Sequence, residues 1–178
     1  MTLFRHPAFA RLSPKMERAR AELSELKKYS NSHYDEFLAG DWGAASAISL
    51  GVYNIYNGIE DILLSLARDV DDAVPGGATM HQDLLDQMVT EIAGIRPAVL
   101  DSELYESLSE LKSFRHLVRH RYGFDLKPER VRENLDRVTV ALPAFIEAVS
   151  SLEQALLEEA PDDNGGGDGS GGGTSGGS

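Results

Sequence analysis

The segment from Phe114 to Gly123, FRHLVRHRYG, gathers three arginines, two histidines and a tyrosine in a chain whose formal net charge is -12. A histidine that titrates near neutrality can take the proton of a ribose 2′-hydroxyl. An arginine fork can hold the negative charge that develops on phosphoryl oxygens. Such a set could cleave RNA without a metal ion. Histidines and arginines also cluster on helices by chance, so these residue types alone are a weak signal.

The helix that would carry this segment begins near Asp101, and an apolar stripe at 4-3-4-3-4 spacing runs along it. The members of the stripe are Leu104, Leu108, Leu111, position 115, Val118 and Tyr122. Position 115 should be apolar, but it is Arg115, which loses hydration there unless something compensates it. Three explanations are open: the guanidinium reaches water at the edge of the bundle, it pairs with a neighbouring helix, or an anionic ligand docks on it.

Helix geometry limits which side chains can act with Arg115. At about 100° per residue, Arg119 lies about 40° round the helix from Arg115, whereas His120 lies about 140° away. His116 and His120 face the same way. On a regular helix Arg115 and His120 therefore do not meet. They could converge if the helix loosens near Gly123, or if a second copy of the chain supplies the missing partner.

Helical spacing also dominates the N-terminal half of the chain. Ser13, as a cap, and Pro14, in the first turn, predict a helix that runs to about Ala39, where Gly40 stops it. Asp41 can cap a second helix. This second helix is apolar on more than one stripe, which favours a central position in a bundle.

The C-terminal half continues the helical pattern. A capping box at Thr79 predicts a short third helix through Ile92, broken at Pro97. The last helix has Pro128 in its first turn and apolar residues at repeated 4-3 spacing, and Pro143 inside it should cause a kink. No long alternating strand pattern and no internal repeat occur. We therefore expect an all-α fold, a bundle of about five helices.

The composition suits one domain of 178 residues, 42% of them apolar. We expect a helical domain over residues 1–160 and a flexible Gly/Ser-rich tail over residues 161–178. The absence of cysteine excludes disulfides and thiolate metal sites and suits a reducing cytoplasm. We find neither a secretory signal nor an apolar run that predicts a membrane span. The acidic balance disfavours broad wrapping of nucleic acid but leaves room for a local basic cleft.

The run from Arg115 to Tyr122 matches an Arg-x4-His-x-Tyr motif, and here the chain resembles the HepT-like ribonuclease toxins, which are HEPN-domain proteins. The stretches GVYNIYNGIEDILL (Gly51–Leu64) and RPAVLDSELYESLSELKSFRHLVRHRYGFDL (Arg96–Leu126) are also similar to that family. The resemblance covers most of residues 13–159. Many family members carry an asparagine directly after the motif arginine. This chain has His116 there, which could take part in catalysis or replace a positioning amide.

The resemblance implies a HEPN-like helical fold that forms a symmetric homodimer and brings two copies of the motif into one composite cleft. It implies a metal-independent endoribonuclease toxin without a cofactor, with Arg115 and His120 as the catalytic pair and RNA, such as tRNA or mRNA, as the substrate. It also implies a nucleotidyltransferase antitoxin that neutralises the toxin by adding AMP to Tyr122. These properties would place the protein in the cytoplasm and away from membranes.

Other charged residues could support the motif. Arg119 and Arg121 are interpreted as a rim that guides RNA, or as a solvated helix face. Glu60 on the second helix could orient the arginine or the histidine, or be a surface charge or the buried partner of another basic residue. His120 could instead be a surface or structural histidine, and Tyr122 an aromatic that closes the helix end against the core.

Two other function classes are open. The chain could be a noncatalytic HEPN module that binds nucleotide, RNA or a nucleotidyltransferase partner, or it could be a purely structural dimerisation domain. A metal centre is not expected, because His6, His33 and His81 have no ligand-like spacing with one another.

Overall fold

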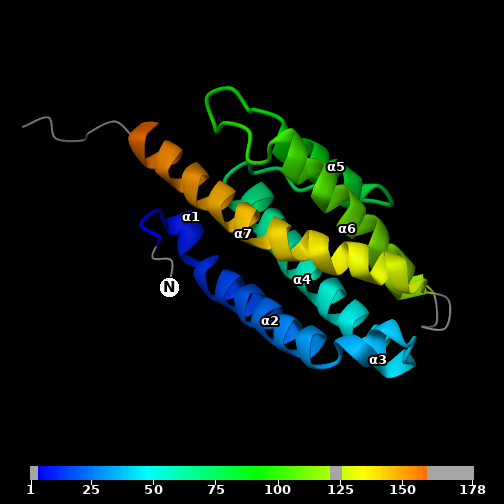
Figure 1. Ribbon diagram of the computed structural model, residues 1–178. Coiled ribbons are helices and arrows are strands. Elements are labelled where there is room, and N and C mark those ends of the chain that lie inside the picture. The colour runs from blue at the N-terminus through cyan, green and yellow to red at the C-terminus, as the bar shows by residue number, and fades with distance from the viewer. Residues whose placement is uncertain (1–3, 121–125, 160–178) are drawn as a thin grey trace, which may run out of the picture.

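The computed structural model describes residues 4–120 and 126–159, in which there are seven helices and no strand. The helices are α1 (Pro7–Ala10), α2 (Ser13–Ser32), α3 (Tyr34–Leu38), α4 (Trp42–Asp69), α5 (Met80–Val89), α6 (Ser102–His120) and α7 (Pro128–Glu159). Five of them have ten residues or more, which confirms the predicted all-α bundle of about five helices. The two short helices, α1 and α3, lie at either end of α2 (Figure 1). The predicted tail, residues 161–178, lies outside the described residues.

Helix α4 is the centre of the bundle, as its apolar stripes predicted. It packs against α2 on one side and against α6 and α7 on the other (Figure 1). Its core residues are fully or almost fully buried: Ile48, Val52, Ile55, Tyr56, Ile59, Ile62, Leu63 and Leu66. Gly51 lets α2 approach closely, because a Cβ there would lie 2.7 Å from Cδ1 of Leu26. The polar residues of α4 that are discussed below are therefore held on a rigid element.

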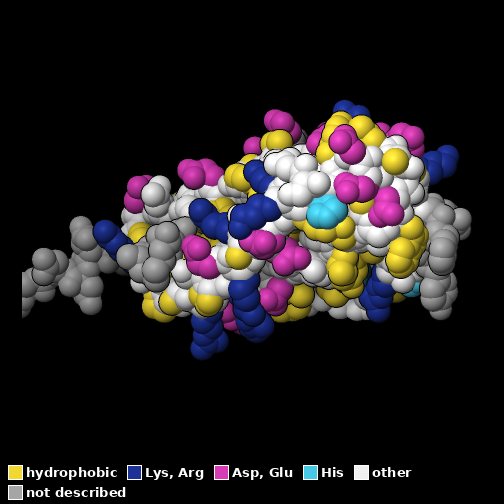
Figure 2. Space-filling view, turned by 60° about the horizontal axis from the view of Figure 1, so that its bottom comes forward, with side chains coloured by type: hydrophobic (Ala, Val, Ile, Leu, Met, Phe, Trp, Pro, Cys, Tyr) yellow, Lys and Arg dark blue, Asp and Glu magenta, His cyan; other side chains and the backbone are white. Residues whose placement is uncertain are grey.

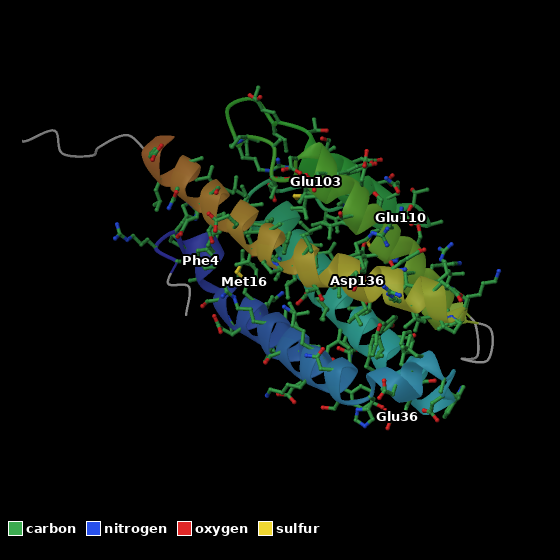
Figure 3. The ribbon with its side chains drawn as sticks, viewed as in Figure 1. Phe4, Met16, Glu36, Glu103, Glu110 and Asp136 are labelled. Carbon is green, nitrogen blue, oxygen red and sulfur yellow. The ribbon has the colours of Figure 1, made fainter. Side chains whose placement is uncertain are left out.

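Helix α7 is long and apolar enough, by length and composition, to cross a membrane, a criterion that the core helices of globular proteins also meet. Its apolar stripe is packed into the bundle, where Val131, Val138, Leu142, Phe145 and Val149 are fully buried. Figure 3 shows the same division between inside and outside: Met16 of α2 lies within the bundle, whereas Glu36, Glu103 and Asp136 lie on its surface.

Three helix ends confirm the expected signals. The carboxylate of Asp41 accepts a hydrogen bond from the backbone of the first turn of α4 at 2.7 Å. Asp101 does the same for α6 at 2.8 Å. Helix α7 begins at Pro128 and contains Pro143, where the expected kink stays a prediction.

The single helix predicted from Ser13 to Ala39 is wrong, because the chain leaves the helical conformation at His33, where φ is -118° and ψ is 27°. The imidazole of His33 stacks on the ring of Tyr29, with centroids 4.0 Å apart. After this break α3 turns Phe37 into the core, where it is 3% exposed. Gly40, with φ of 79°, follows the end of α3.

Three further boundary predictions are wrong. The hydroxyl of Thr79 donates to the carboxylate of Asp83 at 2.7 Å and does not cap the backbone of α5, so the expected capping box is absent. Helix α5 ends before Ile92, because the chain turns back at Gly94 and the backbone of Ile92 pairs with that of Arg96. At α2, Ser13 is the first helical residue and not the cap.

A buried ion pair holds the connection between α5 and α6. Nε and Nη2 of Arg96 lie 2.6 Å and 2.7 Å from the two carboxylate oxygens of Asp71, and both side chains have 0% exposure. The remaining donors of the guanidinium reach the backbone oxygens of Gln87, Thr90 and Pro97. The sequence marked this position only as a helix break. The structure shows that Arg96 fixes where α5 and α6 lie against the end of α4.

Candidate functional site

Arg115 lies at the edge of the buried stripe of α6 and is held by α4. Its side chain is 12% exposed, and Nε donates to Oδ1 of Asn57 at 2.6 Å. Nη2 lies 3.6 Å from Oε2 of Glu60, and the guanidinium lies 6.0 Å from the ring centroid of Tyr53. The fully buried position of this turn is Phe114, which replaces position 115 in the predicted apolar stripe. Among the three explanations for an arginine at position 115, the structure agrees with pairing to a neighbouring helix.

Glu60 is a buried carboxylate between two basic groups. It is 7% exposed, and its Oε1 lies 2.6 Å from Nδ1 of His81 on α5 while Oε2 faces Arg115. Glu60 therefore links α4 to α5 and α6. Its charge also acts on its neighbour Tyr56: burial raises the pKa of that phenol, Glu60 raises it further, and Arg115 opposes the shift. Among the interpretations that the sequence left open for Glu60, the structure agrees with that of a buried carboxylate paired with basic residues.

A cavity of about 560 Å³ opens beside this cluster, between α5, α6 and the start of α7. Its lining residues are Ala78, Thr79, His81, Gln82, Lys112, Ser113, Arg115, His116, Leu117 and Arg130. Three of these carry positive charge, two are histidines, and none of the ten is acidic. Elsewhere the charges are mixed: acidic and basic side chains are interspersed on the face in Figure 2. The cavity is thus lined by basic side chains in a chain that is strongly acidic as a whole.

His120 does not line the cavity that Arg115 lines, in keeping with the angle of about 140° between them on a regular helix. It is exposed at the last residue of α6, and its ring packs on that of His116, with centroids 4.3 Å apart. His116 lines the cavity, whereas His120 is not among the lining residues. Arg119 is exposed on the same turn. Arg121 and Tyr122, the remaining motif residues, lie outside the described part of the chain.

Sequence reasoning missed four residues of the site: Asn57, His81, Lys112 and Arg130. Asn57 had a signal, because it lies three residues before Glu60 and so shares its helix face. Lys112 likewise lies one turn before Arg115. His81 and Arg130 had none, since only the packing of α5 and α7 brings them to α6. Within the described residues no group of three or more histidine, aspartate or glutamate side chains is placed to hold a metal ion.

A comparison with protein families identifies the family to which the chain is similar. The family model described as HepT-like protein matches residues 47–156, which is more than half of the chain. The match runs from the first turns of α4 almost to the end of α7 and so includes the whole cavity. Neither a curated protein nor a solved structure matches the chain. The chain belongs to the HepT-like protein family.

Proposed function

We propose that the protein is a metal-independent endoribonuclease toxin that cleaves RNA through its Arg-x4-His-x-Tyr motif. The observation that carries the proposal is the setting of Arg115, a guanidinium fixed by Asn57 and Glu60 in the wall of a cavity lined by cations and histidines. An arginine held in this way needs little reorganisation when charge develops beside it. Family membership and the motif support the same conclusion.

In this mechanism the scissile phosphodiester lies in the cavity, with Lys112 and Arg130 attracting its charge. His120 takes the proton of the 2′-hydroxyl, and the 2′-oxygen forms a bond to phosphorus while the bond to the 5′-oxygen breaks. Arg115 stabilises the charge on the nonbridging oxygens. The 5′-oxygen takes up a proton as it leaves. The products are a 2′,3′-cyclic phosphate and a 5′-hydroxyl end.

The separation of His120 from the cavity in one protomer favours a composite site. A symmetric dimer with the α6 ends facing each other would supply the exposed His120 of one copy to the cavity of the other. The position of His116, packed on His120 and lining the cavity, suits a residue that positions the catalytic imidazole. Arg119 and Arg121 would form the rim that guides RNA.

Control by an antitoxin follows from the same motif. A nucleotidyltransferase partner that adds AMP to Tyr122 would place a phosphate two residues after His120, within the basic motif. The added group would compete with RNA for the same charges. The toxin, its RNA substrate (tRNA or mRNA) and this partner would meet in the cytoplasm.

Arg115→Ala and His120→Ala test the proposal. Each should relieve growth arrest and lower RNA cleavage in EDTA by about 10²–10⁴-fold. Arg68→Ala is the matched control, because Arg68 is an exposed arginine of α4 that hydrogen-bonds Asp69 and Ser65 on its own helix and does not line the cavity. Full cleavage by both motif variants would remove the ribonuclease function. RNA binding without cleavage by the native protein would favour the noncatalytic HEPN module.

A further inference from the structure

His81 of α5 is a histidine of the cavity that lies outside the motif. Its side chain is 32% exposed and belongs to the cavity lining together with Arg115. Its Nδ1 lies 2.6 Å from Oε1 of Glu60. Two cavity-lining residues, one on α5 and one on α6, thus share the carboxylate of Glu60. One of its oxygens faces His81 and the other faces Arg115.

The contact with Glu60 sets the chemistry of the ring. An ionised carboxylate only accepts hydrogen bonds, so we assign the proton of this contact to Nδ1 of His81, which donates a hydrogen bond to Oε1 of Glu60. Within the described residues Nε2 makes no hydrogen bond. When the ring is protonated, the buried carboxylate compensates its charge. Nε2 is then a proton donor at the edge of the cavity, oriented by a partner on a separate helix.

The position of α5 does not depend on this contact alone. Three apolar residues of α5, Leu84, Leu85 and Met88, are buried in the core. Gln82 donates to the hydroxyl of Tyr105 on α6 at 2.9 Å. A tether from His81 to Glu60 is therefore redundant for holding the helix, whereas an imidazole fixed beside a cation-lined cavity has a chemical use.

We infer that His81 is the general acid of the cleavage reaction, an inference that rests on the proposed function above. As the bond between phosphorus and the 5′-oxygen breaks, Nε2 of His81 gives its proton to that oxygen. His81 becomes neutral and keeps the proton on its Nδ1, which stays hydrogen-bonded to Glu60. His120 holds the proton of the 2′-hydroxyl, and exchange with water returns both histidines to their starting states. Cleavage then uses one imidazole from the motif and one from α5.

A substrate whose leaving group needs no proton can distinguish a general acid from a residue that only supports the structure. The cleavage site is first mapped on total cellular RNA, and a synthetic stem-loop that carries the site is made with oxygen or with sulfur at the bridging 5′ position. The protein variant is His81→Asn, whose amide can still donate to Glu60 and so keeps the link between α4 and α5. His33→Asn, at the histidine between α2 and α3, is the control, and melting temperatures check that both variants fold.

His81→Asn should cleave the oxygen substrate about 10²–10⁴-fold more slowly than the native protein, because the leaving oxygen lacks its proton donor. It should cleave the sulfur substrate within about tenfold of the native rate, because a thiolate leaves without protonation. Arg115→Ala should be slow on both substrates. Equal losses on the two substrates, or no loss on either, would overturn the inference while leaving the ribonuclease function intact. A native protein that cleaves neither substrate nor the mapped RNA overturns both.

Discussion

The Nε of Arg115 donates to Oδ1 of Asn57 across the contact between α6 and α4, at 2.6 Å. This bond fixes the direction in which the guanidinium points, while Glu60 at 3.6 Å supplies the opposite charge. The motif arginine is thus oriented by a residue that lies 58 positions earlier in the chain. The orientation of its guanidinium depends on how α4 and α6 pack.

Replacement of Asn57 should therefore lower activity without unfolding the protein. We expect Asn57→Ala to reduce kcat for RNA cleavage by about 10–100-fold, with little change in KM, because a misdirected arginine stabilises the transition state less well. Asn57→Asp, which keeps the accepting oxygen, should recover most of the loss. Asn54→Ala is the matched control, because Asn54 lies one turn earlier on α4 and donates to Glu22 of α2. Steady-state kinetics with equal melting temperatures distinguish the outcomes, and identical kcat values for both variants would contradict a positioning role.

The buried pair of Asp71 and Arg96 should dominate the local stability. Asp71→Ala leaves a guanidinium of 0% exposure without its counter-ion and should lower the free energy of unfolding by about 3–5 kcal/mol. Asp69→Ala, which removes the partner of the exposed Arg68, should cost at most about 1 kcal/mol. Urea titrations of the two variants give the comparison. Similar losses for both would show that the buried pair is not a special anchor.

The carboxyl of Asp86 should titrate below its usual range. Hydrogen bonds from the Tyr105 hydroxyl and from Gln82 lower the pKa of Asp86, Lys112 lowers it further, and partial burial opposes them. Because the pKa of Asp86 is lower in the folded state, its contribution to stability is present above the unfolded pKa of about 4 and is lost as the pH falls through the folded value. NMR titration of the carboxyl carbon measures the shift. Tyr105→Phe should move the pKa of Asp86 back upward, and an unchanged midpoint would rule out the hydroxyl as the main cause.

Mixed dimers can test the composite site. If each site takes Arg115 from one protomer and His120 from the other, mixing Arg115→Ala with His120→Ala chains restores one intact site in each heterodimer. Random mixing should then recover about a quarter of the native cleavage rate. Light scattering tests beforehand whether the protein is a dimer. No recovery from a verified mixed dimer would mean that both groups act within one protomer.

Modification of Tyr122 should follow incubation with the cognate nucleotidyltransferase and ATP. Mass spectrometry should find AMP on this tyrosine, with loss of RNA cleavage in proportion to the modified fraction. Tyr122→Phe should stay unmodified and keep its activity in the presence of the transferase. Modification on a different residue would dissociate antitoxin control from the motif.

The sequence by itself determined the helical architecture and the motif. Apolar periodicity placed the five long helices, and the carboxylates of Asp41 and Asp101 marked two of their starts, because caps and amphipathic faces are local properties of the chain. Such signals were weaker at His33, where a stacked ring and the burial of Phe37 interrupt a pattern that reads as continuous helix. Rotation per residue also separated Arg115 from His120 on α6.

Only the tertiary structure decided what surrounds the motif arginine. Asn57, Glu60 and His81 come from two other helices, and their meeting with Arg115 depends on the angle and register at which those helices pack. Local spacing carries no information about such contacts between distant segments. The packing of the helices therefore orients the guanidinium of Arg115, at the edge of the apolar stripe, beside a cation-lined cavity. A charge that loses its hydration is stabilised only by partners that the tertiary structure brings to it.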